Sequence, residues 1–345
     1  MKIERRLEPS RVLQVAAPVL SLLLALGAIA VVFGALRVNP LVAYREIFRG
    51  AFGSLYGLSE TVTKTIPLLL VGVGLVFAYR AQVWNVGAEG QLLMGAIAAT
   101  GVALHFPNLP AMFVAGFLAG ALWALIPAVL KAWSRVDEVL TSLMLVYVAG
   151  EAVNFLIYGP WKGAQSRGFP LTDEFAESAQ LPVIGWSRIH YPTLILALVA
   201  AGLVFVLIRH TKIGFEIRVT GENQAAAHYA GMAYGKVVFV VMAMSGGLAG
   251  LAGVGEVAGI HHRLLYSGGI SPGYGFSGII VAWLARLNPL AAIVSAFLLG
   301  GLLVGGDAIQ VSLGLPAATI EIFNGMILLF VLGGEVMTRY RIRWS

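Results

Sequence analysis

The sequence contains no cysteine and few charged residues. Without cysteine, the 345-residue chain forms no disulfide, no thiolate metal site and no thiol nucleophile. Charged residues make up 12% of the sequence, about half of the ~25% typical of a soluble domain. Hydrophobic residues make up 59%, and no water-soluble core can bury that much apolar surface. The chain is therefore predicted to be an integral membrane protein in the lipid bilayer.

The sequence also lacks motifs for nucleotides and metals. The nearest approach to a P-loop, GMAYGKV at 231–237, has neither the spacing nor the Ser or Thr that holds magnesium. GVGEVA at 253–258 fits a loose dinucleotide fingerprint, but it lies in an apolar segment with no preceding strand, which favours helix packing. His261 and His262 are adjacent, so a helix would point them to different faces. We expect this chain to bind no cofactor or metal and to be no enzyme.

Long apolar runs fill most of the chain. A helix needs about 20 apolar residues to cross a bilayer. The runs predict an all-α, polytopic membrane helix bundle of about ten transmembrane helices, in a single domain over residues 1–345. The predicted spans are Val12–Leu36, Thr61–Tyr79, Val86–Leu104, Pro110–Leu130, Val139–Tyr158, Tyr191–Ile208, Val237–Val257, a short glycine-broken segment at Tyr274–Ala285, Leu287–Gly306 and Thr319–Gly334.

The basic residues predict the orientation of these spans. With ten spans both termini lie on one side, and most of the 23 lysines and arginines lie on that side too. Cytoplasmic segments carry such an excess, so both termini are predicted to be cytoplasmic. The same rule accounts for the net charge of +6 without a nucleic-acid partner. The N-terminal MKIERR precedes an apolar run too long for a cleavable signal, so no cleavage is expected.

Small residues recur at the spacing used for close helix packing. Three glycine pairs lie four residues apart, and such pairs let helix backbones approach closely in lipid. We therefore expect helix–helix contacts at these pairs: Gly116 with Gly120, Gly246 with Gly250, and Gly301 with Gly305.

Two polar segments interrupt the apolar runs. Residues 159–190 are predicted to form an extracytoplasmic loop, which serves either as an ordered docking surface or as a passive cap. Residues 209–236 are predicted to be cytoplasmic. Within them, ENQAAAHYAGM indicates a short helix of strong helix formers that ends near Gly231, a residue suited to a C-terminal cap. This helix either docks in a partner's groove or is an ordinary connection.

Several of these segments resemble a known family. RVTGENQAAAHYAGM followed by KVVFVVMAMSGGLAGLAGVGEVAG resembles the cytoplasmic loop and next helix of permease subunits of bacterial ABC importers. WNVGAEGQLLMGAIAA and NPLVAYREIFRGAFGS resemble the N-I-G-x-E-G-Q segment and the first outer loop of the branch for ribose and branched-chain amino acids, with Val86 in place of the more usual isoleucine. The resemblance runs over roughly residues 10–335. It is nearest to nucleoside permeases that work with basic-membrane-protein-type receptors.

The resemblance implies a function and a set of partners. Such a permease is a multi-pass protein of the bacterial plasma (inner) membrane. It pairs with a second permease subunit, identical or homologous, and with cytoplasmic ATPase subunits that bind ATP and magnesium. An extracytoplasmic solute-binding protein delivers the solute, which stays open among nucleosides, riboflavin-like compounds and sugars.

The resemblance also implies which residues couple the chain to its ATPase. By analogy, the coupling residues are Gly221, Glu222, Asn223, Ala225, Ala226 and Gly231. We expect a bulky charged residue at Gly221 or Ala226 to uncouple ATP hydrolysis from uptake while leaving the chain folded.

Polar residues within the spans are candidates for the translocation pathway, because ionisable groups in a bilayer are usually functional. They are Asn85, Glu89, Gln91, Glu151, Asn154, Glu256, Glu321 and Asn324. For Glu89 and its two amide neighbours, a polar clamp between helices is slightly favoured over contact with the solute. The alternative function, an ion-coupled secondary transporter, would favour charges near the midplane and an inverted repeat, and the sequence has no convincing repeat.

Overall fold

The computed structural model describes residues 2–5, 11–134, 136–164, 166, 168–316 and 318–343. These residues are almost entirely helical, which confirms the predicted fold class in its main feature. In the part of the chain described, the only strands are β1 (Lys2–Arg5) and β2 (Tyr340–Arg343), which pair antiparallel with Arg5 opposite Tyr340. By its contacts the chain divides into two compact units, Met1–Thr61 with Gly301–Ser345, and Val62–Gly300. That the whole chain acts as a single permease domain stays a prediction.

The apolar runs form helices close to their predicted bounds. Ten helices overlap the ten predicted segments: α1 (Arg11–Ala35), α3 (Leu55–Arg80), α4 (Ala88–His105), α5 (Leu109–Ser134), α6 (Glu138–Tyr158), α7 (Tyr191–His210), α10 (Tyr234–Gly255), α12 (Tyr274–Leu284), α13 (Ala291–Leu313) and α14 (Ala318–Arg339). Among the described residues, six helices are long and apolar enough to cross a membrane, or seven if the bent pair Leu23–Ala35 and Pro40–Phe52 is one span. The structure thus describes a polytopic helical membrane protein, and the number ten stays a prediction.

In the first unit, α1 packs along α14 and turns into α2 (Pro40–Phe52), a helix that the sequence interpretation placed in a loop. The turn is built by Asn39, whose side chain caps α2 by accepting from the backbone N–H of Leu41 at 2.9 Å. The rings of Phe33 and Phe323 meet edge to face at 5.0 Å. Gly301 and Gly305 lie against α2, where added methyl groups would overlap Phe52 and Ile47, so this predicted packing pair is confirmed.

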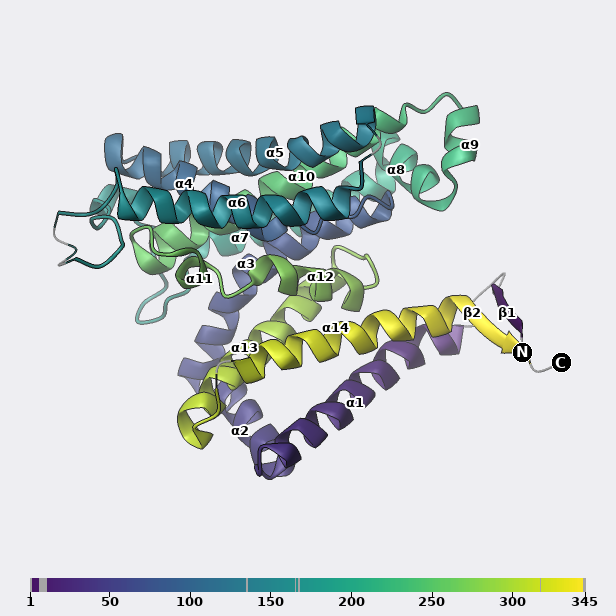
Figure 1. Cartoon of the computed structure of the whole chain (residues 1–345), viewed down its shortest axis with the longest axis horizontal. Coiled ribbons are helices and arrows are strands. Elements are labelled where there is room, and N and C mark those ends of the chain that lie inside the picture. The colour runs from purple at the N-terminus through teal and green to yellow at the C-terminus, as the bar shows by residue number, and fades with distance from the viewer. Residues whose placement is uncertain are drawn as a thin grey trace. The chain divides into compact units, whose positions relative to one another are not determined.

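In the second unit, α4, α5 and α10 pack against one another (Figure 1), and glycine brings their backbones into contact. A methyl group on Gly120 would overlap the carbonyl oxygen of Gly246, and one on Gly250 would overlap the carbonyl oxygen of Gly116. The four residues of the two predicted pairs therefore pack against each other. Gly253, from the loose dinucleotide fingerprint, lies against the backbone of Leu92 in the same way, which confirms its packing role.

The outer helices of this unit leave apolar faces uncovered. Only 28% of the span in α6 and 33% of the spans in α5 and α7 is buried, compared with 78% for the span from Tyr234 to His261. A helix that is apolar all round and still exposed suits lipid or another membrane subunit, not water. By contrast, α4 buries its polar residues Glu89, Gln91 and Thr100 among protein groups.

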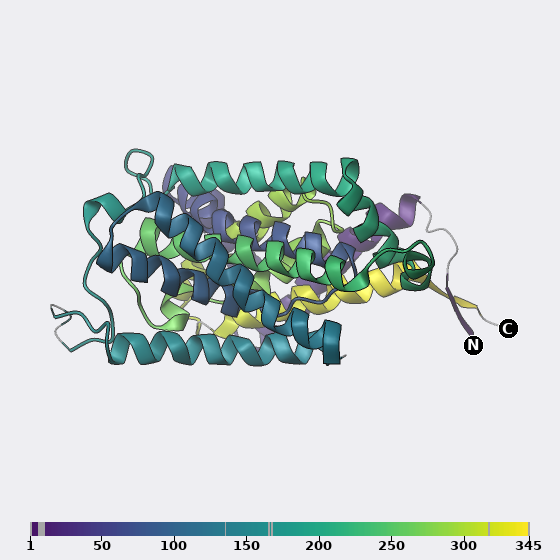
Figure 2. The same ribbon diagram turned by 90° about the horizontal axis from the view of Figure 1, so that it is seen from above.

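The two polar segments lie at opposite ends of this unit (Figures 1 and 2). One end holds α8 (Lys212–Glu222) and α9 (Gln224–Tyr229). The other end holds the 159–190 loop, with the short helix η1 (Glu177–Ala179), close to η2 (Glu256–His261, a π-helix) and α11 (Ser267–Ile270). Backbone bonds tie this loop to the chain after α10, such as Phe175 N–H to the His262 carbonyl at 2.8 Å. The described part of the loop is therefore ordered.

Candidate functional site

The turn between α3 and α4 holds a buried amide network. Asn85 is fully buried and Gln91 is 1% exposed. Asn85 Nδ2 donates to Gln91 Oε1 at 2.8 Å and to Ser245 Oγ on α10 at 2.9 Å, while Gln91 Nε2 donates back to Asn85 Oδ1 at 2.9 Å. The Tyr79 hydroxyl donates to the Asn85 carbonyl at 3.0 Å. The network fixes the bend between two helices and ties it to a third.

Glu89, on the first turn of α4, points at the beginning of α12. Its carboxylate accepts from the backbone N–H of Gly275 at 2.6 Å, and also from the Ser271 side chain and the Gly273 backbone. Gly275 has no side chain because the α4 backbone passes there: a methyl group would overlap the backbone of Glu89. The carboxylate therefore satisfies N–H groups that the first turn of α12 leaves free. These are the contacts that a clamp between helices requires.

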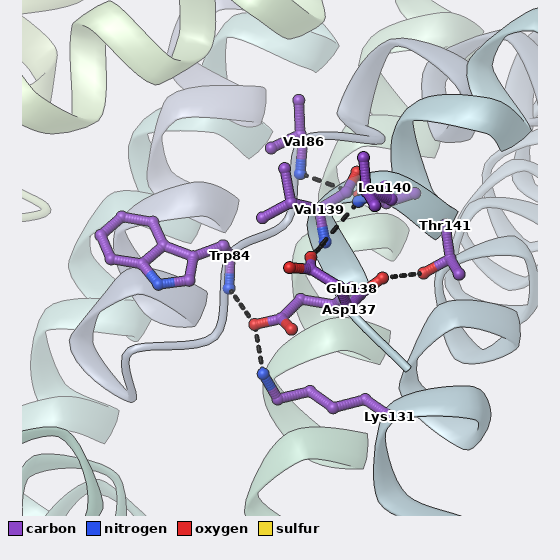
Figure 3. A network of polar contacts seen from close by, with 9 residues as sticks. Trp84, Val86, Lys131, Asp137, Glu138, Val139, Leu140 and Thr141 are labelled. Atoms are coloured by element: carbon purple, nitrogen blue, oxygen red, sulfur yellow. Dashed lines mark hydrogen bonds and ion pairs between the residues drawn. The ribbon is translucent and has the colours of Figure 1, made fainter. Parts of the chain in front are cut away.

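A second anchor holds the same turn against α5 and α6 (Figure 3). Glu138, 5% exposed, accepts from the Trp84 backbone N–H at 3.2 Å and pairs with Lys131 at the end of α5. Beside it, Asp137 caps α6 by accepting from the Val139 N–H at 2.7 Å. Sequence analysis did not single out this anchor, although an Asp before an apolar run is an ordinary helix-start signal.

Glu256 begins the π-helical end of α10 and is 4% exposed. Its carboxylate lies 3.8 Å from Nε2 of His261, five residues on. A π-turn places residues i and i+5 on one face, so the widened helix brings these two side chains together. Sequence analysis found Glu256 but could not see this partner, because an α-helical wheel separates the two residues.

His190, just before α7, lies next to this π-turn. It is fully buried, its Nδ1 contacts the Thr193 hydroxyl, and its Nε2 has no hydrogen-bond partner among the described residues. Gly259 leaves room for the ring, since a methyl group there would come within 2.7 Å of it. Burial, with a smaller effect from Arg188, lowers the pKa of His190 to about 4, so the ring is neutral at pH 7.

Glu151 and Asn154 lie on the outer face of α6, not inside the unit. Glu151 is exposed, and Asn154 Nδ2 donates to its carboxylate at 3.4 Å. The exposed stripe around them is apolar and includes Tyr147 and Phe155, which are 65% and 70% exposed. A carboxylate in the middle of an exposed apolar stripe needs cover from protein or water within a membrane.

Glu321 and Asn324 belong to α14, in the other unit. Glu321 is exposed. Asn324 is half-buried, and its Oδ1 is buried without a hydrogen-bond partner among the described residues. The candidate pathway residues thus fall into separate groups. Within the second unit, Asn85, Glu89 and Gln91 cluster around the start of α4, whereas Glu151 lies on the outer face of α6.

The expected short helix in the 209–236 segment exists as α9, and its caps are complete. The side chain of Asn223 accepts from the Ala226 N–H at 3.0 Å. At the other end, Gly231 has a φ of 73°, and bonds from Gly231 N–H to the His228 carbonyl and from Met232 N–H to the Ala227 carbonyl, both 3.0 Å, close the helix. The predicted glycine cap is confirmed.

Most of the predicted coupling residues are exposed, from the end of α8 to the residue that caps α9. Glu222, Asn223, Ala225, Ala226 and Gly231 are exposed. Gly221 differs: it belongs to α8, and a methyl group there would overlap the carbonyl oxygen of Arg80 at the end of α3. The expectation that a bulky residue at Gly221 leaves the chain folded is therefore wrong, because the site has no room for one.

Comparison with known proteins gives the family. The family model described as "Branched-chain amino acid transport system / permease component" matches residues 57–332. The chain belongs to this permease family. The glucose ABC transporter permease protein TsgB13 of Haloferax volcanii is 36% identical, over 99% of this chain and 94% of its own length. In Bacillus subtilis, the guanosine ABC transporter permease proteins NupP and NupQ are 34% and 27% identical, over 91% and 70% of this chain and 92% and 78% of their own lengths.

The permease is thus a multi-pass membrane subunit of an ABC transporter, as the sequence resemblance implied, and not an ion-coupled secondary transporter. Subunits of this kind are not themselves enzymes, since a separate subunit carries the ATPase. Among the residues described, no three His, Asp or Glu side chains group closely enough to hold a metal ion. The described residues provide hydrogen-bonding and charged side chains, and α9 provides a small exposed helix.

Proposed function

We propose that this permease is the translocation subunit of an importer for nucleosides or a related small polar solute such as a sugar. The observation that carries the proposal is its similarity, over nearly the whole chain, to permeases named for guanosine and for glucose. Both solutes are neutral and rich in hydroxyl groups, so they are recognised by hydrogen bonds and not by counter-charges. The polar side chains that we propose for the pathway carry such groups: Glu151, Asn154, Glu256, Glu321 and Asn324.

In the proposed topology, ten segments enter the membrane and both termini are cytoplasmic. The excess of basic residues on that side favours it. It puts α9 on the cytoplasmic side and the 159–190 loop outside, in agreement with their positions at opposite ends of the second unit. With 11 residues α12 rises about 17 Å, too little to cross a bilayer. We therefore treat α12 as a segment that enters the membrane beside α4 without spanning it.

We propose that α9 is the coupling helix that rests on a cytoplasmic ATPase subunit, which binds ATP and magnesium. The helix is short, capped at both ends and exposed, with Tyr229 92% exposed beyond its alanine face. Small side chains let a partner's groove close around the helix backbone, and the caps let it transmit force without unwinding. Glu222, Asn223, Ala225, Ala226 and Gly231 form the contact surface, and Gly221 sets the angle between α8 and α3.

We propose that the face of α6 carrying Glu151 and Asn154 faces the translocation pathway and a second permease subunit, identical or homologous. Burying a lone carboxylate in lipid is costly, whereas a partner subunit and a solvated pathway would both relieve it. Glu256, Glu321 and Asn324 are proposed to line the outer part of the route. Asn85, Glu89 and Gln91, whose polar atoms bond within the chain, are proposed to position α4 without touching the solute.

The remaining proposed partner is an extracytoplasmic solute-binding protein on the 159–190 loop. Two aromatic side chains of this loop, Phe169 and Trp186, are 68% and 69% exposed, while Phe175 is buried and anchors the loop. Exposed aromatics on an ordered loop suit a docking surface.

The test begins with mild-detergent purification of the tagged permease from its native host and identification of co-purifying proteins by mass spectrometry. We expect an ATPase with a P-loop, a second permease and a secreted binding protein. Titration of that binding protein with guanosine, uridine, riboflavin and glucose then identifies the solute, and ATP-dependent uptake into proteoliposomes confirms it. A permease that purified alone and moved solute on an ion gradient without ATP would overturn the proposal.

A further inference from the structure

A basic cavity lies beside the end of α7. It has a volume of about 210 Å³ and is lined by Arg80, Arg209 and Arg218 together with Phe205, Asn288 and Pro289. The three arginines come from the ends of α3 and α7 and from α8, so the fold brings together charges that are up to 138 positions apart in the sequence.

The arginines are held in place by the chain itself. Arg80 Nε donates to the Leu287 carbonyl at 2.9 Å, and Arg218 donates to the Ile208 carbonyl at the end of α7. Arg209 lies over the Phe205 ring, 5.7 Å from its centre. A guanidinium has five N–H donors, so each of these contacts leaves donors for a ligand. Arg218 repels Arg80, and Glu222 offsets only part of that charge.

The cavity lies where the apolar part of α7 ends and charged residues begin. α7 is uncharged from Tyr191 to Ile208 and then meets Arg209. On the same helix, Leu203 and Val206 are 58% and 48% exposed, so an apolar outer surface leads up to the charged cavity. Arg80 and Arg218 are half-buried and lie next to the exposed Arg209. This charged cavity, together with the apolar face of α7 beside it, suits a ligand that has an anionic head and an apolar tail.

We propose that this cavity binds the phosphate of an anionic phospholipid, with the acyl chains lying along the exposed face of α7 near Phe205. Guanidinium groups bind phosphate oxygens in pairs, and basic pockets at the ends of membrane helices hold anionic lipid head groups. The apolar path selects a lipid over free phosphate. The bound lipid would join the ends of α3 and α7 to α8, the helix that leads directly into α9. The inference depends on α7 spanning the membrane and not on the identity of the transported solute.

Native mass spectrometry of the full-length permease with phosphatidylglycerol or phosphatidylcholine tests this site. We expect one phosphatidylglycerol to stay bound at collision energies that remove phosphatidylcholine. In R209Q the retained phosphatidylglycerol should fall on the order of fivefold, as expected for one surface arginine. R209K should keep part of the retention, because it keeps the charge and loses the two-pronged geometry. Arg209 is the residue of choice for substitution because, unlike Arg80 and Arg218, it makes no hydrogen bond to a backbone carbonyl among the described residues.

Lys212→Gln is the matched control, since it removes one charge at the same end of the molecule from a side chain that is 91% exposed. Retention in K212Q should equal that of the unchanged protein. Equal losses in K212Q and R209Q, or equal retention of both lipids, would overturn the proposal. Lipid-free protein is also heated with millimolar inorganic phosphate or with phosphatidylglycerol. If phosphate stabilises the protein as much as the lipid does, the site binds free phosphate and the lipid proposal is wrong. ATP-driven uptake, measured in parallel, reports on the proposed function separately.

Discussion

The side-chain amides of Asn85 and Gln91 bond to each other twice, at 2.8 and 2.9 Å, across the bend from α3 into α4. Both residues are buried, so each amide relies on the other for its hydrogen bonds. A third partner, Ser245 on α10, completes the network. The bend is therefore held by side chains and not only by backbone geometry.

Asn85→Ala should destabilise the permease by about 2–4 kcal/mol, since it leaves the buried Gln91 amide and the Ser245 hydroxyl without partners. Gln91→Ala should have a similar effect, and the double variant should cost clearly less than the sum, because the second truncation removes the orphaned partner. Thermal unfolding in one detergent measures all three. Asn154→Ala, which changes a half-exposed amide on α6, is the control, and additive losses at 85 and 91 would contradict the coupling.

Glu89→Gln should lower stability by about 1–3 kcal/mol, because an amide accepts fewer hydrogen bonds and brings an N–H₂ toward backbone donors at the start of α12. The apparent affinity for the transported solute should stay unchanged, since we propose a positioning role for Glu89. Unfolding curves and uptake kinetics separate the two effects. A changed solute affinity at unchanged stability would mean that Glu89 lines the pathway.

Gly120→Ala should destabilise the permease strongly, by 2 kcal/mol or more as an order-of-magnitude estimate, because a methyl group at this position meets the backbone of Gly246 in a closely packed interior. Gly202→Ala is the matched control on α7, where nothing lies within 4 Å of an added methyl group. That substitution should be neutral or stabilise by up to about 1 kcal/mol through helix propensity. Similar losses at both positions would refute the close-packing interpretation.

Ala226→Glu should uncouple ATP hydrolysis from uptake, because it puts a larger, charged side chain on the exposed face of α9. Folding should be unaffected, because Ala226 is exposed. ATPase activity and uptake are measured together on the reconstituted complex. Met232→Leu, a conservative substitution that leaves the neighbouring Gly231 unchanged, is the control. Full coupled transport in the Ala226→Glu variant would show that α9 is not the coupling helix.

Lowering the pH from about 6.5 to 4 should weaken the fold through His190. In the unfolded chain this histidine gains its proton near pH 6.5, whereas in the folded chain burial lowers its pKa to about 4. Between these values the unfolded state binds the extra proton, so the free energy of unfolding falls as the pH falls, by up to about 3 kcal/mol. His190→Gln should flatten this part of the pH profile. A His190→Gln variant that kept the full pH dependence would disprove the assignment.

The sequence predicted the positions of the helices better than the contacts between them. Runs such as Tyr191–Ile208 are long and uncharged, so length alone identifies them, and the ENQAAAHYAGM segment carries its own cap signals. The turn of α1 into α2 was missed because Asn39–Pro40, an ordinary helix start, was taken as loop. Sequence also could not supply the partner of Asn85, because Ser245 lies 160 positions away and helices that are apolar all round give no facing direction. The arginine cavity was missed for the same reason.

The glycine contacts among α4, α5 and α10 also decide how the second unit can deform. Where two backbones touch, no side chain lies between them to change rotamer, so one helix cannot tilt without carrying its neighbour. These three helices must therefore turn as a rigid block. Any opening and closing during a transport cycle has to be taken up at the looser outer helices, at the π-turn that ends α10, and at the joint where Gly221 meets the end of α3.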